Sequence, residues 1–226
     1  MEINKNALIP IQEIFFRNDI FRTDIINLLI KKYEFKSYLE IGVYDGSNFE
    51  HIECESKTSV DPNQWGYTTH VMTSDEFFTS ISKDQKWDII FIDGLHEYRQ
   101  CYKDIINATK HLNPGGFIIC HDMNPLQKCN VISYEEYKAI TDSGLYESYS
   151  WNGDVYKAFI KFRKEHIDWS SCMLYDCDWG IGVITKGIGQ KIECDVDNLT
   201  FDDFMLNKGY LMNSISVEEF LNLFCK

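Results

Sequence analysis

The sequence predicts an α/β fold built on a doubly wound, mostly parallel sheet. Short apolar strands alternate with helices five times between residues 37 and 123, and this alternation is typical of a parallel sheet with helices on both faces. Residues 87–92 form an almost continuous apolar run, as expected for a central strand that is covered on both sides. A strand, a glycine turn and the start of a helix follow one another within residues 38–47.

The glycine turn comes directly after the first strand, residues 37–41. Gly42 and Gly46 permit a tight turn and let the backbone approach a ligand closely. We expect Ser47 or Asn48 to cap the helix that follows and runs to about residue 54. A turn of this kind, early in an α/β chain, is where nucleotide-like ligands bind.

The side chains of this turn argue against a phosphate ligand. The turn lacks the G-x-G-x-x-G spacing and no Gly-Lys-Ser/Thr follows it. It carries Glu40 and Asp45 instead, and two carboxylates would repel a pyrophosphate. They suit a ligand with cationic or hydroxyl groups, although an ordinary strand-to-helix turn is the simpler alternative.

Further acidic residues stand where later strands end. Asp61 closes the second strand, residues 57–60, and an acid at this position can accept hydrogen bonds from ribose hydroxyls. The alternative is an acid in an ordinary Asp-Pro turn. Asp93 follows the fourth strand and Asp122 follows the fifth, residues 117–120. Because parallel strands end at one edge of the sheet, we expect their carboxylates to converge.

The remaining elements follow from periodicity and capping signals. Thr23 is expected to cap a helix that reaches Tyr33, and Ser74 to cap a helix after a short third strand, residues 70–73. The other expected elements are a helix over 98–111, a helix over 155–164, a hairpin of residues 172–175 and 181–185, and a last helix capped by Ser216.

Length and composition fit one domain. The chain has 226 residues, 44% of them hydrophobic, which is enough for a sizeable core. A formal charge of −13 argues against nucleic acid and anionic membranes as partners. There is no apolar run of about 18 residues and no signal-peptide core at the N-terminus. Eight cysteines without a C-x-x-C pair predict reduced thiols, no structural zinc and a cytoplasmic location.

Three motifs together resemble one family. W-D-I-I-F-I-D-G-x-H-x-Y, N-P-G-G-F-I-I-C-H-D and the later W-N-G-D-V-Y-K-A are similar to segments of class I S-adenosylmethionine (SAM) methyltransferases, in the group that includes small-molecule and sugar O-methyltransferases. The glycine turn resembles motif I of that family, E-x-G-x-x-x-G-x-S. The resemblance implies a Rossmann-like sheet of seven strands with an antiparallel last strand, and SAM as cofactor.

The resemblance also assigns cofactor contacts. The glycine turn would hold the methionine end of SAM, Asp61 the ribose, and Ser74 with Asp75 the adenine, although Ser74 could serve only as a cap. The residues implied in cofactor binding are Glu40, Gly42, Tyr44, Asp45, Gly46, Ser47, Asp61, Ser74, Asp75 and Asp93.

A hydroxyl acceptor needs a general base near the transferred methyl group. Members of the group use the histidine of D-G-x-H, which is His96 here, and neutral imidazole can accept a proton near pH 7. The alternative is a surface histidine at a helix start. His121 and Asp122 could orient the acceptor. Some relatives bind Mg²⁺ with the residues matching Asp93 and Asp122, but this chain has His121-Asp122 in place of two acids, which puts the metal in doubt.

The expected organisation is a single domain over residues 1–226. It comprises an N-terminal helical segment (1–36), a SAM-binding core (37–123), a segment that could cover the substrate (124–150), and C-terminal helices with the closing hairpin (151–226). The last helix could cover the domain edge or form a homodimer. The expected function is O-methylation of a small acceptor, a sugar or glycan by resemblance. The alternatives are a non-catalytic SAM-binding module and a nicotinamide-dependent oxidoreductase, which the missing G-x-G-x-x-G disfavours.

Overall fold

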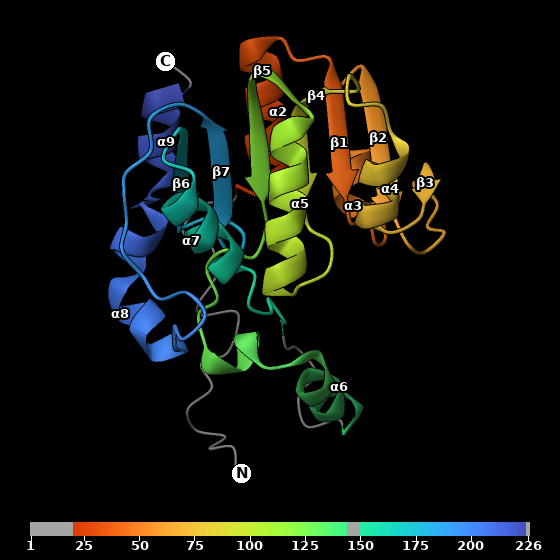
Figure 1. Ribbon diagram of the computed structural model, residues 1–226. Helices are drawn as coiled ribbons and strands as arrows, with labels where there is room; N and C mark the ends of the chain where they lie inside the picture. Colours follow the sequence, from red (N-terminus) through yellow and green to blue (C-terminus); the bar gives the residue numbers. More distant parts are fainter. Residues whose placement is uncertain (1–19, 144–149, 225–226) are drawn as a thin grey trace.

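The computed structural model describes residues 20–143 and 150–224. A central sheet runs through the molecule, and helices pack on both of its faces (Figure 1). The apolar cluster expected at Ile11, Ile14, Phe15 and Phe16, and the lid tyrosines Tyr146 and Tyr149, lie outside the described residues. The strands are β1 (Ser37–Ile41), β2 (Ser56–Asp61), β3 (His70–Val71), β4 (Trp87–Ile92), β5 (Leu112–Cys120), β6 (Trp169–Leu174), β7 (Ile181–Lys186) and β8 (Ser214–Ile215).

The sheet confirms the predicted fold class. Its order is β3-β2-β1-β4-β5-β7-β6-β8, and the first five of these strands are mutually parallel. β7 lies between β5 and β6 and runs antiparallel to both, as the closing hairpin predicted. The described sheet has eight strands rather than seven, because two-residue β8 pairs with the edge of β6. Two residues are too few for a sequence pattern to reveal.

Two apolar layers cover the sheet. One contains side chains of α5 and α7 together with inward-facing residues such as Leu39 and Ile90. The other contains α2 and α9 and the opposite face of the same strands, including Ile89 and Phe91. The helices are α2 (Arg22–Tyr33), α3 (Ser47–Glu50), α4 (Ser74–Ser80), α5 (Tyr98–Lys110), the 3-10 helix η2 (Lys128–Val131), α6 (Tyr134–Asp142), α7 (Tyr156–Glu165), α8 (Phe201–Met212) and α9 (Val217–Phe224).

Helix α9 packs on a face of the sheet of its own domain, rather than on the domain edge. The Phe224 ring meets Phe117 of β5 edge-on at 5.8 Å, and Phe220 is fully buried. Ser216 caps the helix, since its hydroxyl accepts from the Glu219 amide at 3.1 Å, as predicted. Helix α8 was not predicted. No helix among the described residues is long and apolar enough to span a membrane.

The predicted caps at the start of α2 and α3 were wrong. Thr23 lies inside the first turn of α2, and its hydroxyl donates to Asn48 Oδ1 at 2.8 Å. Helix α3 is capped by Gly46, in the left-handed conformation at φ +81°, and ends at Glu50 rather than near residue 54. Asn48 is buried because its amide points into the domain, as described below. The side chains of Thr23 and Asn48 therefore make tertiary contacts instead of capping helices.

Helix α4 is capped one residue earlier than predicted. The Thr73 hydroxyl accepts from the Glu76 amide, and the Glu76 carboxylate accepts in return from the Thr73 amide and hydroxyl. This capping box satisfies the first turn of the helix. Ser74 is thereby left free of the capping role that the sequence pattern suggested.

Candidate active site

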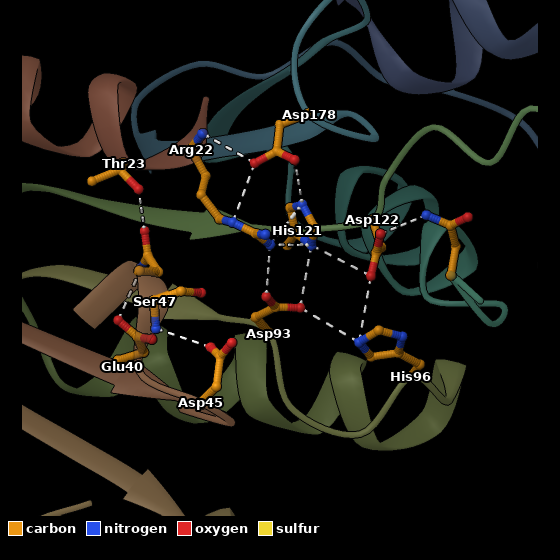
Figure 2. A network of polar contacts seen from close by, with 12 residues as sticks. Arg22, Thr23, Glu40, Asp45, Ser47, Asp93, His96, His121, Asp122 and Asp178 are labelled. Carbon is orange, nitrogen blue, oxygen red and sulfur yellow. Dashed lines mark hydrogen bonds and ion pairs between the residues drawn. The ribbon is translucent and has the colours of Figure 1, made fainter. Parts of the chain in front are cut away.

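Acidic side chains from three strand ends gather at one edge of the sheet. Glu40 is the second-to-last residue of β1, next to the glycine turn, while Asp93 follows β4 and Asp122 follows β5 (Figure 2). Gly42, at φ +86°, brings the two loops into contact: a Cβ on it would lie 2.1 Å from the Asp93 carbonyl oxygen. This contact requires glycine, so the turn found in the sequence also sets the spacing of the site.

Glu40 is buried and held by neutral donors. The Tyr38 hydroxyl donates to Glu40 Oε2 at 2.5 Å, and Asn48 Nδ2 donates to the same oxygen at 2.9 Å. Asn48 Oδ1 accepts from Thr23, which ties the start of α2 to this carboxyl group. Burial raises the pKa of Glu40 to about 8, against the lowering effect of the two donors. Its ligand-free form at neutral pH is therefore mainly the protonated acid.

Asp61 fixes the glycine turn. One carboxylate oxygen accepts from the backbone amides of Val43 and Tyr44 at 3.0 and 3.2 Å. The other accepts from the Asn63 amide at 2.8 Å and from the Trp65 indole at 3.1 Å. The acid at the end of β2 thus lies beside the turn, as expected. Its partners are protein groups that shape the turn.

The rest of the turn faces outward. Tyr44 is 70% exposed, and its ring meets Trp65 edge-on at 5.3 Å. Asp45 accepts from the Ser47 amide at 3.0 Å, and hydrogen bonds with Ser47 lower the pKa of Asp45. A Cβ on Gly46 would lie 2.0 Å from the Tyr67 ring, so the turn closes tightly there too.

Ser74 and Asp75 lie at the start of α4 and contact α5. Gln100 donates to both side chains, at 3.2 and 3.3 Å, and Lys103 forms an ion pair with Asp75. The described contacts of these two residues do not link them to Glu40, Asp93 or the histidines. These contacts join α4 to α5, so the contact of Ser74 and Asp75 with adenine stays a prediction.

His96 lies between two carboxylates. Its Nε2 is 3.4 Å from Asp93 Oδ1 and 3.4 Å from Asp122 Oδ2. Its Nδ1 is 2.8 Å from the carbonyl oxygen of Trp151, so Nδ1 carries the hydrogen, and the Trp151 ring stacks on the imidazole at 5.2 Å. Burial lowers the pKa of His96, but the two aspartates and the Trp151 carbonyl outweigh it and raise the pKa to about 9.

His121 is the second histidine of the cluster, buried between three acids. Its Nδ1 is 3.3 Å from Asp93 and 3.4 Å from Asp122, and its Nε2 is 3.4 Å from Asp178. Burial opposes the charged ring, but Asp122 and Asp93 raise the pKa of His121 well above its usual range. The pKa of Asp93 is correspondingly lowered, because His121 and His96 overcome the effect of burial.

Sequence reasoning missed two members of the cluster, Arg22 and Asp178. Arg22 pairs with Asp93 at 3.0 Å and with Asp178 at 3.2 Å, so the start of α2 reaches the sheet edge (Figure 2). Asp178 and Trp179 have positive φ values of 38° and 60° in the turn before β7. In the sequence, the only signal for Asp178 is its place in the turn Asp178-Trp179-Gly180 between the two predicted hairpin strands. No sequence feature distinguishes Arg22.

The cluster contains one candidate metal-binding group among the described residues. Asp93, His96 and Asp122 each offer one ligand atom, and these atoms lie within 4.8 Å of one another. Mg²⁺ prefers oxygen ligands in near-octahedral geometry, whereas imidazole suits transition metals. The donor set therefore fits a divalent cation with mixed nitrogen and oxygen ligands better than Mg²⁺. Arg22 and His121 also already pair with these carboxylates.

Comparison with known families finds a similarity in the first part of the sheet. A family model described as a methyltransferase domain matches residues 39–123, the part that carries β1–β5 and the glycine turn. No curated protein matches the chain significantly. The match shows that residues 39–123 are similar to a methyltransferase domain, and the parallel strands that these residues form make up the core of the sheet.

Several solved structures share this fold. The O-methyltransferase TomG from Streptomyces achromogenes, involved in tomaymycin synthesis and solved with SAM, has a TM-score of 0.52 and 11% identity over 74% of this chain and 79% of its own. An O-methyltransferase from Bacillus cereus, solved with S-adenosylhomocysteine (SAH), has a TM-score of 0.51 and 16% identity over 77% and 86%. At such identities the similarity establishes the fold alone.

The protonated state of Glu40 gives a prediction about stability. The folded protein keeps a proton on Glu40 up to about pH 8, whereas the unfolded chain releases it near pH 4.5, the ordinary pKa of a glutamate. Stability from this group is therefore full below about pH 4.5 and is lost as the pH rises toward 8. Glu40→Gln, which cannot ionise, should gain in melting temperature over the wild type between pH 5 and 8.

Thermal unfolding at several pH values measures this effect. The exposed Glu53→Gln is the matched control, and its difference from the wild type should stay constant. A Glu40→Gln difference that is equally constant would show that Glu40 ionises normally.

Proposed function

We propose that this protein is a SAM-dependent O-methyltransferase that acts on a small hydroxylated acceptor, with His96 as the general base. The observation that carries the proposal is the fixed imidazole of His96: one nitrogen is bound to Trp151 and the other is directed at the edge where the carboxylates gather. The fold and the family match support the cofactor. A non-catalytic SAM-binding module would have no need of an imidazole fixed in this way.

The cofactor is proposed to lie along the carboxyl edge of β1, β2 and β4. Glu40, the glycine turn and Asp93 would face its methionine end, Asp61 its ribose, and Ser74 with Asp75 its adenine. Binding of the cationic cofactor would favour the ionised form of Glu40. Because Asp61 already shapes the turn through Val43 and Tyr44, the turn is built before any ligand arrives, which lowers the entropic cost of binding.

When bound, SAM supplies an electrophilic methyl group with a thioether as leaving group. The protein must align the acceptor oxygen, exclude water and remove one proton. His96 Nε2 would take the hydroxyl proton as the oxygen–carbon bond forms, and the resulting imidazolium would be stabilised by Asp93 and Asp122. His121 and Asp122 would orient the acceptor. The buried position of His121, 6% exposed, restricts it to this supporting role.

The acceptor is proposed to be a sugar or glycan. Rings of Tyr134 and Tyr137 on α6 lie 5.1 and 5.6 Å from the Trp151 ring, which itself stacks on His96. Aromatic faces of this kind can pack against the apolar face of a sugar ring, and Tyr134 is 50% exposed. This cluster supports the proposal that the described part of residues 124–150 helps to cover the substrate.

Location and assembly complete the proposal. The described cysteines are free thiols, in keeping with a reducing, cytoplasmic compartment. A homodimer, expected from the C-terminal helix, stays a prediction that sedimentation velocity can test. Nucleic acid and membrane are not proposed as partners, because of the formal charge of −13.

The first experiment tests cofactor and base together. SAH should raise the melting temperature, and no stabilisation at millimolar SAH would remove the cofactor assignment. Methyl transfer to a panel of sugars and phenols is followed as SAH release. His96→Asn should lower turnover by about 10²- to 10⁴-fold, the usual contribution of a general base, while SAH affinity is kept.

His166→Asn is the matched control, because His166 ends α7 and does not contact the cluster. It should retain turnover. A non-catalytic module would bind SAH equally well in all three proteins and release none from SAM with any acceptor, whereas full turnover in His96→Asn would exclude His96 as the base.

The raised pKa of His96 predicts the pH dependence of the reaction. With a pKa of about 9, only about 1% of the imidazole is in the basic form at pH 7. The value of kcat/KM should therefore rise about tenfold per pH unit up to pH 9 and level off above it. His96→Asn should lose this rise; a wild-type profile that is already level at pH 7 would contradict it.

A divalent cation on Asp93, His96 and Asp122 is the second candidate arrangement. Bound there, a metal would polarise the acceptor hydroxyl in place of the imidazole base. Because these carboxylates are already paired with Arg22 and His121, we expect Mg²⁺ to give no heat in a calorimetric titration and activity to survive EDTA. Loss of activity in EDTA that Mg²⁺ restores would establish magnesium at this site.

A further inference from the structure

Residues 151–153 contact the proposed base from several sides. The Trp151 carbonyl oxygen accepts from His96 Nδ1 at 2.8 Å, and the Trp151 ring stacks on the imidazole with an interplanar angle of 27°. Gly153 has φ +65°, and a Cβ on it would lie 1.8 Å from the His96 carbonyl oxygen. The segment thus touches both the ring and the backbone of His96, and only glycine fits at its last position.

Asn152 connects the same segment to the other nitrogen of His96. Its side chain is fully buried, and its Nδ2 donates to Asp122 Oδ1 at 2.5 Å. The second oxygen of that carboxylate, Asp122 Oδ2, faces His96 Nε2. The amide oxygen of Asn152 is buried with no hydrogen-bond partner among the described residues. Folding alone gives no reason to bury an amide whose oxygen has no hydrogen-bond partner among the described residues, so the bond that this amide donates to Asp122 is the feature to explain.

The segment is fastened at its other side to the chain before α6. The Asn130 carbonyl oxygen accepts from the amides of both Asn152 and Gly153 at 3.0 Å, and Asn130 Nδ2 donates to Ser150. The Trp151 indole donates to the Ile132 carbonyl oxygen at 2.9 Å. The segment therefore has a firm support that does not depend on His96.

A last contact joins this region to the helix that carries the base. Asp154 Oδ1 accepts from the backbone amide of Tyr98, the first residue of α5, at 2.7 Å. His96 lies two residues before that helix, so its backbone is bracketed by Gly153 on one side and by this bond on the other.

We propose that residues 151–153 position His96 for methyl transfer and that Asn152 is a positioning residue that acts through Asp122. Trp151 fixes the Nδ1 side of the imidazole directly, and Asn152 fixes the Nε2 side by orienting the Asp122 carboxylate. The proposal rests on the proposed function of His96 as the base. The W-N-G-D sequence is then a support for the active site rather than an ordinary loop.

The test observes His96 directly, without any acceptor. Ligand-free protein labelled with ring-¹⁵N histidine should show the hydrogen-bonded Nδ1–H of His96 by NMR, and its absence in His96→Asn assigns the signal. Asn152→Asp keeps the shape of the side chain but replaces the donor with a carboxylate beside Asp122. Asn152→Ala removes the donor without adding charge. Both should shift or abolish the signal, because the carboxylate and the segment lose their common anchor.

Asn113→Asp is the matched control, because Asn113 Nδ2 also donates to an aspartate, Asp88, at 2.7 Å, but at the opposite end of β5. It should leave the His96 signal unchanged. Asn152→Ala should also keep SAH affinity within about threefold of the wild type, since no contact of Asn152 belongs to the proposed cofactor residues.

The proposal would be overturned by the absence of a His96 Nδ1–H signal in the wild type, by an unchanged signal in both Asn152 variants, or by an equal loss in Asn113→Asp. Loss of SAH affinity together with the signal in Asn152→Ala would show a general structural role and would also overturn it. Failure of the wild type to bind SAH contradicts the proposed function instead, and leaves the NMR result to be judged separately.

Discussion

Three carboxylates and three basic side chains share one edge of the sheet, and the rest of the site depends on their mutual neutralisation. Asp93, Asp122 and Asp178 face Arg22, His96 and His121 at 3.0–3.4 Å. Burying any one of these charges without its partners would cost several kcal/mol. The cluster therefore joins α2, β4, β5 and the turn before β7, and the candidate site forms only when all four have docked.

The sequence predicts the framework well because the framework is local. The strand over residues 87–92 has the predicted bounds, and the acids at the ends of β1, β2, β4 and β5 lie where the alternation of strands and helices requires. Arg22 and Asp178 escaped prediction because their partners are distant in the sequence. Arg22 is 71 residues from Asp93 and 156 residues from Asp178, and only folding brings these side chains together. Thr23 and Asn48 were misassigned as caps because short polar side chains serve either purpose.

The histidine before Asp122 changes the character of the site. The sequence shows only that an acid expected from the resemblance is replaced by His121. The structure adds that His121 is buried against three aspartates, so its charge compensates theirs. Whether a histidine serves as base, cation or metal ligand depends on the groups around it, and those groups come from four separate parts of the chain. The residue type alone therefore could not show which of these three roles His121 has.

Asp122 has a left-handed backbone conformation, with φ of 62°. Neighbouring residues of a strand normally point to opposite faces, yet His121 and Asp122 both reach the same cluster because the chain turns at this position. Among side chains, asparagine and aspartate tolerate this conformation best, and glycine adopts it freely. The backbone thus narrows the choice at position 122 to about three residues, and aspartate alone among them brings a negative charge. Substitution of Asp122 by asparagine or glycine would keep the turn but lose the negative charge, and other side chains would strain the turn.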